Sequence, residues 1–149
     1  MSALNILLVD NDHNLVTTLS HGLRKAMGKG ISIAVCFSGA EALLRLADQR
    51  FDVVISDFNM PGLSGLELFN NLQQEYRETI FILITAFGSD TLEVETRRLG
   101  IGYLTKPFGM PLLVQVIHEL LRGKETKEKK ENALQILTPN PEGSASISS

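Results

Sequence analysis

Asp57 stands where a short apolar segment ends and a turn begins. Residues 51–56 are mostly apolar and rich in β-branched side chains, which is typical of a strand covered on both faces. The residues Met60-Pro61-Gly62 follow, in which proline fixes φ and glycine permits a turn. We therefore expect Asp57 at the carboxyl end of a central strand, the edge of an open α/β sheet where ligands bind.

Polar side chains follow three other apolar segments in the same way. They are Asp10 and Asn11 after residues 4–9, Thr85 after residues 79–84, and Lys106 shortly after residues 101–104. Because the carboxyl ends of parallel strands meet at one edge of a sheet, we expect these side chains to surround Asp57. The sequence therefore predicts a charged site of carboxylates and one ammonium group at this edge.

The elements that must position these side chains alternate between strand and helix five times. Apolar spacing predicts strands over residues 4–9, 31–37, 51–56, 79–84 and 101–104, each followed by a helix, the last over residues 110–121. This alternation implies an α/β fold with a parallel sheet and helices on both faces. We expect the flavodoxin-like, doubly wound order 2-1-3-4-5, because it places Asp10 next to Asp57 at the switch point.

Helix starts are indicated by side chains that can accept hydrogen bonds from free backbone amides. The predicted caps are Asp12, Ser38 with Glu41, Ser64 with Glu67, and Asp90 with Glu93. Gly28 and Gly100 are expected to end the first and fourth helices. The capping role makes Asp12 a structural residue rather than a ligand.

The composition is that of one globular domain. A net charge of -3 and a pI of about 5.6 argue against nucleic acid or an anionic membrane as the direct ligand. The single cysteine, Cys36, excludes an internal disulfide and is expected to be a buried strand residue. The N-terminus lacks a basic and apolar leader, and no segment reaches membrane-spanning length, so we expect a cytoplasmic protein without a membrane partner.

The composition changes near residue 123. Residues 1–123 hold the predicted domain, and residues 124–149 form a tail that is first charged and then rich in Pro, Gly and Ser. The charge run at residues 124–131 is expected to prolong the last helix with solvated side chains, and residues 138–149 are expected to be disordered. Two interpretations of the tail stay open, a linker to a further module and a frayed terminus.

The residues at the strand ends match the order found in one known family. They are Asp10 and Asn11, Asp57, Thr85 with Ala86, and Tyr103 with Lys106-Pro107. Over about residues 4–122 the chain resembles the receiver domain of two-component response regulators. The resemblance implies a signalling domain that is not an enzyme. It also implies a histidine kinase or phosphotransfer protein as phosphate donor, and a downstream protein or effector domain as partner.

The resemblance implies a role for each site residue. By this resemblance, Asp57 is the phosphoacceptor, and Lys106 pairs with the phosphoryl oxygens. Thr85 and Tyr103 form the switch. Mg²⁺ is held by Asp10, Asn11, Asp57 and the backbone carbonyl of Asn59. Thr85 hydrogen-bonds the phosphoryl group, and the Tyr103 ring turns inward as the threonine moves. The chemistry agrees, because a carboxylate approaching a phosphate dianion needs neutralising cations more than an acid or a base.

By the same resemblance, the fourth helix, fifth strand and last helix form the surface that switches. Val94 is an expected exposed contact there, because Leu92 and Leu99 take the buried side of its helix. A partner protein or a second copy of the chain is expected to bind through this surface. The histidines form no ligand-like cluster and are expected at the surface; they are His13, His21 and His118.

The residues at positions 11 and 87 are expected to affect Mg²⁺ binding and the lifetime of the phosphate. Receivers usually carry two successive acidic residues after the first strand, and here the second is Asn11. Our hypothesis is that Mg²⁺ binds more weakly and that phosphorylation is slowed or dispensed with. Phe87, two residues after Thr85, is expected to shield an acyl phosphate from water and so to slow its loss.

Two alternative functions stay open. A pseudo-receiver would share the fold and signal without phosphate, and Asn11 keeps this interpretation open. A phosphohydrolase with an aspartate nucleophile needs a second carboxylate two residues after the nucleophile as its general acid. That position holds Asn59, which argues against the phosphohydrolase.

Overall fold

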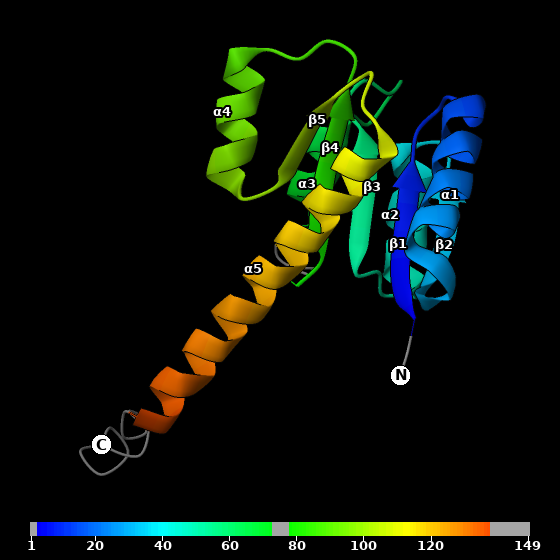
Figure 1. Ribbon diagram of the computed structural model, residues 1–149. Coiled ribbons are helices and arrows are strands. Elements are labelled where there is room, and N and C mark those ends of the chain that lie inside the picture. The colour runs from blue at the N-terminus through cyan, green and yellow to red at the C-terminus, as the bar shows by residue number, and fades with distance from the viewer. Residues whose placement is uncertain (1–2, 73–77, 138–149) are drawn as a thin grey trace.

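The computed structural model describes residues 3–72 and 78–137 of the 149-residue chain. Five parallel strands form one sheet in the order β2-β1-β3-β4-β5 (Figure 1). The strands are β1 (Leu4–Val9), β2 (Ile31–Cys36), β3 (Val53–Asp57), β4 (Ile80–Thr85) and β5 (Gly102–Thr105). The predicted flavodoxin-like order is confirmed, the bounds of β1 agree with the predicted ones, and the other strands differ from theirs by at most two residues at either end.

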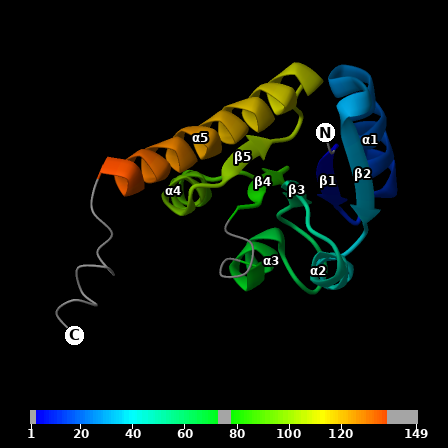
Figure 2. The ribbon, with the colours of Figure 1, turned by 90° about the horizontal axis from the view of Figure 1, so that it is seen from below.

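Helices cover both faces of this sheet. They are α1 (His13–Met27), α2 (Gly39–Asp48), α3 (Gly65–Leu72), α4 (Asp90–Leu99) and α5 (Met110–Leu137), with a short 3-10 turn η1 (Gly28–Gly30) after α1. Figure 2 shows α1 and α5 on one face of the sheet and α2 and α3 on the other. Leu92 and Leu99 of α4 pack with the cluster that α2 and α3 cover.

The apolar core consists of two clusters, one on each face of the sheet. Along β1, Ile6 and Leu8 belong to the cluster under α1 and α5, whereas Leu7 and Val9 belong to the cluster under α2 and α3. Successive strand residues point to opposite faces, so a strand with both faces covered must be apolar throughout. All residues of β3 and β4 are buried, which explains their continuous apolar runs.

Three of the four predicted helix caps are confirmed. The Asp12 carboxylate accepts hydrogen bonds from two backbone amides at the start of α1. At α3, the Ser64 and Glu67 side chains each accept from the backbone amide of the other, at 3.1 and 3.0 Å. At α2, the Ser38 hydroxyl accepts from the Glu41 amide at 3.1 Å, but the Glu41 carboxylate accepts from the Phe37 amide at 3.2 Å and not from the Ser38 amide, as a capping box would require.

The predicted cap of α4 is wrong by one residue. Ser89 has an extended backbone, and its hydroxyl accepts a hydrogen bond from the Leu92 amide at 3.1 Å. Asp90 is the first helical residue, and an N-cap must lie outside the helical conformation. Asp90 and Glu93 therefore lie in the first turn, where negative charge favours the helix dipole.

Helix α5 continues well beyond the predicted end at residue 121. It passes through Gly123 and extends past the sheet to Leu137 (Figure 1). The expectation that the charge run prolongs the last helix is confirmed. Lysine and glutamate, which dominate this run, are good helix formers. The domain boundary at residue 123 stays a prediction, and residues 138–149 lie outside the described part of the chain. None of the helices described is long and apolar enough to cross a membrane.

Candidate functional site

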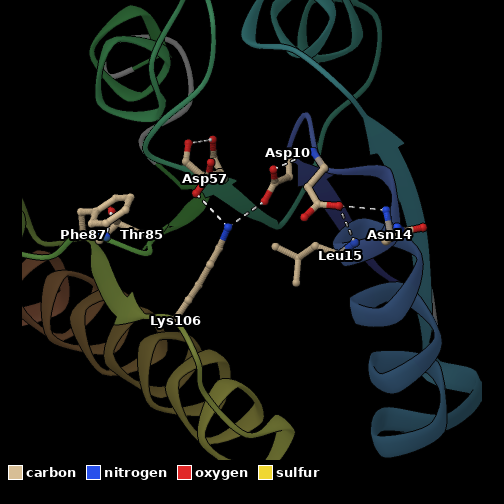
Figure 3. Close-up of polar contacts among 9 residues, drawn as sticks. Asp10, Asn14, Leu15, Asp57, Thr85, Phe87 and Lys106 are labelled. Atoms are coloured by element: carbon tan, nitrogen blue, oxygen red, sulfur yellow. Dashed lines mark hydrogen bonds and ion pairs between the residues drawn. The ribbon is translucent and has the colours of Figure 1, made fainter.

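Asp10, Asp57 and Lys106 converge at the carboxyl edge of the sheet (Figure 3). The Nζ atom of Lys106 lies 3.3 Å from Asp10 Oδ2 and 3.2 Å from Asp57 Oδ1. Both aspartates are buried, with 5% and 6% of their surface exposed. The structure therefore places one ammonium group between two buried carboxylates that are 47 residues apart in the chain.

The strand register explains how these residues meet. Val9 of β1 lies opposite Ser56 of β3, so Asp10, which follows β1, and Asp57, the last residue of β3, lie side by side. Lys106 follows β5, and its backbone amide donates to the Thr85 carbonyl at 2.8 Å. Its flexible four-carbon stem then reaches over the end of β4 to the two carboxylates.

A glycine supports the backbone at Asp57. A Cβ atom at Gly65 would lie 2.4 Å from the Asp57 carbonyl oxygen, so a larger residue would displace the strand end. The Gly65 amide donates to the Phe58 carbonyl at 3.0 Å, which joins the start of α3 to the end of β3. Sequence reasoning did not find this role. The available indication was a glycine directly after the capping Ser64.

The loop after β1 is ordered by its two aspartates. Asp10 Oδ1 accepts a hydrogen bond from the Asp12 amide at 2.9 Å. Asp12 Oδ1 in turn accepts from the amides of Asn14 and Leu15 at 3.1 and 3.2 Å. Asp12 is therefore engaged at the start of α1, and Asn11 between the two aspartates is exposed.

The buried site contains two carboxylates and one ammonium group. The pKa of Asp57 is raised above its ordinary value, first because burial removes water and second because the Asp10 charge lies nearby. The Lys106 ammonium and a hydrogen bond with the Phe58 backbone act in the opposite direction. One cation thus compensates the two carboxylates only in part, which favours binding of a further cation.

The oxygen donors at this edge suit Mg²⁺. Asp10 and Asp57 offer carboxylate oxygens, and this hard ion takes one or two carboxylates and keeps several waters. Asn11 and Asn59 are exposed. Within residues 3–72 and 78–137, no three His, Cys, Asp or Glu side chains are grouped as a metal site. The residues present therefore fit the predicted Mg²⁺ ion. They offer it two carboxylates, because the residue at position 11 is an asparagine.

Thr85 and Phe87 lie on the β4 side of Asp57, opposite Asp10 (Figure 3). Thr85 is fully buried, and its Oγ1 accepts a hydrogen bond from the Phe87 amide at 3.1 Å. The Phe87 side chain is 79% exposed. The Thr85 hydroxyl is thus held by its own loop, and the Phe87 ring extends into solvent beside the site.

Tyr103 lies on β5, the edge strand of the sheet, and is half-buried. Its hydroxyl oxygen is buried and has no hydrogen-bond partner among the described residues. The same region of the surface carries Val94 of α4, which is 62% exposed as expected. The structure therefore places the predicted switch aromatic and the predicted contact residue on neighbouring elements.

The histidines and Cys36 are not part of the group formed by the Asp10, Asp57 and Lys106 side chains. All three histidines are exposed, and His13 stacks on Phe37 with ring centroids 3.8 Å apart. Cys36 is fully buried, as expected. An open, mostly apolar groove of about 650 Å³ runs between α1 and α5, and its lining includes Gly22, Met110 and Val114 but none of the residues at the carboxylate site.

Comparison with protein families gives one match that covers most of the chain. The family described as the response regulator receiver domain matches residues 6–118. Receiver domains of response regulators are signalling domains of two-component systems. The matched residues include both carboxylates and the lysine of the site.

Individual proteins and structures are similar over nearly the same part. The chain is 34% identical to the transcriptional regulatory protein GlrR of Escherichia coli (strain K12), over 91% of this chain and 30% of that protein. It is 32% identical to the transcriptional regulatory protein FixJ of Bradyrhizobium diazoefficiens, over 88% of this chain and 63% of that protein. The chain thus spans less than two thirds of these relatives.

Solved structures agree with this assignment. The chemotaxis response regulator CheY4 of Vibrio cholerae matches with a TM-score of 0.70 and 30% identity, over 80% of this chain and 99% of that one. The receiver domain of the Francisella response regulator 1452 matches with a TM-score of 0.70 and 28% identity, over 79% and 96%. The strand order, the site at the carboxyl edge and these matches together show that the chain belongs to the response regulator receiver domain family.

Proposed function

We propose that Asp57 accepts a phosphoryl group and that this modification switches a partner-binding surface. The observation that carries the proposal is the Lys106 ammonium between the buried carboxylates of Asp10 and Asp57. A buried acceptor beside a fixed cation, with a second carboxylate that can hold a metal ion, is suited to bring an anionic oxygen toward a phosphate group.

Each residue contributes a distinct part of this chemistry. An Asp57 carboxylate oxygen attacks phosphorus, the bond from phosphorus to the donor's leaving group breaks, and an aspartyl phosphate results. Lys106 is close enough to pair with the phosphoryl oxygens as a point charge. Mg²⁺ held by Asp10, Asn11, Asp57 and the Asn59 carbonyl would supply further charge neutralisation when bound. Catalysis here is positioning and charge compensation rather than proton transfer.

The buried Thr85 hydroxyl, at the end of the strand next to β3, is the group that we propose to respond to the phosphate. It accepts a hydrogen bond from the Phe87 amide in this structure. If it also donated a hydrogen bond to the phosphoryl group, its movement would pull on the loop after β4. Tyr103 of β5 lies next to Gly88 of that loop, and the loop leads directly into α4. Phosphorylation would therefore stabilise a state in which the surface of α4, β5 and α5 is altered, as a population shift.

The partners follow from the family and stay proposals for this chain. Response regulators receive phosphate from histidine kinases and act on downstream effectors. We propose a histidine kinase or phosphotransfer protein as the donor in the cytoplasm, and a protein, effector domain or second copy as the receiver of the signal. Direct contact of residues 1–149 with nucleic acid is not expected from the net charge of -3.

Asn11 supports a second candidate function, a pseudo-receiver that signals without phosphate. This residue lowers the number of carboxylates available to Mg²⁺ to two. If the ion binds too weakly to neutralise an incoming phosphoryl group, Asp57 stays unmodified. The phosphohydrolase alternative is less well supported, because the side-chain amide of Asn59 is far too weak an acid to serve as the general acid.

One experiment separates these candidates. The protein is incubated with Mg²⁺ and acetyl phosphate, and its intact mass is measured over time beside an Asp57→Asn variant. Addition of one phosphate that is absent from the variant supports the proposed function. An unchanged mass supports the pseudo-receiver, and rapid release of inorganic phosphate over many turnovers supports the hydrolase.

A further inference from the structure

The Tyr103 hydroxyl occupies an unfavourable position. It is buried where β5 meets the loop between β4 and α4, and it has no hydrogen-bond partner among the described residues. A hydroxyl that leaves water without gaining a partner loses its hydrogen bonds. The placement of this side chain therefore depends on packing of its ring, and on space being left for the hydroxyl.

Gly88 of that loop leaves this space. A Cβ atom at Gly88 would lie 2.3 Å from the Tyr103 hydroxyl oxygen and 2.6 Å from Thr105 Cγ2. Both distances are far inside van der Waals contact. Among the described glycines, positive φ angles occur only at Gly28, Gly62 and Gly100, so the backbone at position 88 does not itself require glycine. The requirement is steric and comes from the side chains of β5.

We propose that Gly88 is the positioning residue for Tyr103: its missing side chain admits the hydroxyl, and a side chain at position 88 moves the tyrosine ring outward. The tyrosine yields because its hydroxyl is the far end of a side chain that rotates about χ1. Thr105 is β-branched and belongs to a strand paired with β4, so it yields less. Outside, the hydroxyl regains water.

The consequence for signalling rests on the function proposed above. Gly88 lies three residues after Thr85, in the segment that joins the carboxylate site to α4. If a side chain at position 88 keeps Tyr103 outside, phosphorylation of Asp57 would no longer alter the surface of α4 and β5. Phosphate transfer itself would be unchanged, since the Gly88 contact involves neither the carboxylates nor Lys106.

The test observes Tyr103 directly. The chain has two tyrosines, so Tyr76→Phe makes Tyr103 the only site for 3-fluorotyrosine. The difference in ¹⁹F chemical shift between H₂O and D₂O, the solvent isotope shift, then reports how far the ring is exposed to solvent. We expect a small solvent isotope shift in this parent protein and one close to that of free fluorotyrosine after Gly88→Ala. A solvent isotope shift that stays at the parent value in a folded Gly88→Ala protein would overturn the proposal.

Gly109→Ala is the matched control, because the nearest atom to a Cβ there is Pro111 Cδ at an ordinary 3.5 Å. It should leave the ¹⁹F shift at the parent value, and a change as large as in Gly88→Ala would count against a specific contact.

A second measurement keeps the proposal testable if Gly88→Ala fails to fold. Tyr103→Phe removes only the unpaired hydroxyl, so its melting temperature should equal or exceed that of the parent. The double variant Gly88→Ala/Tyr103→Phe should be more stable than Gly88→Ala, because it removes the 2.3 Å contact with the hydroxyl and leaves only the Thr105 Cγ2 contact at 2.6 Å to be relieved. A lower melting temperature for Tyr103→Phe would overturn the proposal. Absence of phosphate on the parent by intact mass would contradict only the function proposed for Asp57.

Discussion

The Nζ atom of Lys106 lies 3.3 Å from a carboxylate oxygen of Asp10, although 96 residues separate the two in the chain. The Lys106 side chain is 24% exposed and that of Asp10 is 7% exposed. Such a pair is largely removed from water, so the loss of one partner leaves the other charge poorly compensated.

Lys106→Met should destabilise the fold as well as the proposed chemistry. The variant keeps most of the side-chain volume but leaves Asp10 and Asp57 without their shared cation, at an expected cost of about 1–3 kcal/mol. Urea unfolding in the presence of EDTA measures this change. Lys29→Met, at an exposed position, is the control and should cost much less. Adding Asp10→Asn should restore part of the loss, and no recovery would contradict the coupling.

Asn11→Asp should strengthen Mg²⁺ binding. A carboxylate at position 11 adds a unit negative charge beside the two buried carboxylates, and we expect roughly tenfold higher affinity or more. Titration with Mg²⁺ followed by NMR shifts of the Asp57 and Lys106 amides gives the affinity. Asn14→Asp adds the same charge on an exposed residue of the first turn of α1 and should change the affinity far less. Equal affinities for parent and Asn11→Asp would refute the role given to position 11.

Phe87→Glu should shorten the lifetime of a phosphorylated Asp57. The Phe87 ring lies beside the site on the β4 side, and an apolar ring hinders the approach of water where a carboxylate would not (Figure 3). We expect the intact phosphoprotein to decay several-fold faster once acetyl phosphate is removed. Leu44→Glu, at a 73% exposed position on α2, is the control for adding surface charge. Identical decay in all three proteins would exclude shielding by Phe87.

Cys36 should be inert toward thiol reagents near neutral pH. Burial raises its pKa to about 11 from 9.0, the Glu41 charge adds to the rise, and Arg45 opposes it. A two-unit rise lowers the thiolate fraction about a hundredfold, so the native reaction with a disulfide reagent at pH 8 should be slower than in urea by at least roughly that factor. The thiol favours the fold fully below pH 9, and this contribution is lost as the pH rises toward 11. Comparable native and unfolded rates would contradict the buried position.

Ser89→Ala should cost more stability than Asp90→Ala. The Ser89 hydroxyl accepts the capping hydrogen bond of α4, and removal of such a cap costs about 1 kcal/mol. Asp90 contributes through the helix dipole alone, which is worth roughly 0.3–1 kcal/mol when exposed. Thermal melting of the two variants checks the order, and the reverse order would place the cap at Asp90.

Local patterns determined the elements and several of their ends. The side chains of Ser64 and Glu67 are three residues apart, and their reciprocal hydrogen bonds need no partner from elsewhere in the chain. The alternation of apolar strands and helices likewise leaves few topologies open, and the strand order was predicted on that basis. The cap of α4 was missed because Ser89 and Asp90 are both good capping residues, and only the backbone angles of Ser89 separate them.

The sequence by itself thus determined the elements and the polar residues that follow the strands, since these depend on periodicity and turn chemistry, and it narrowed the strand order to a few, of which the predicted one brings Asp10 next to Asp57. Only the tertiary structure decided that Lys106 lies between Asp10 and Asp57, that Gly65 supports the Asp57 backbone, and that Gly88 makes room for Tyr103. The physical reason is that these contacts depend on strand register and on distances of a few ångströms between distant segments, which local patterns do not contain.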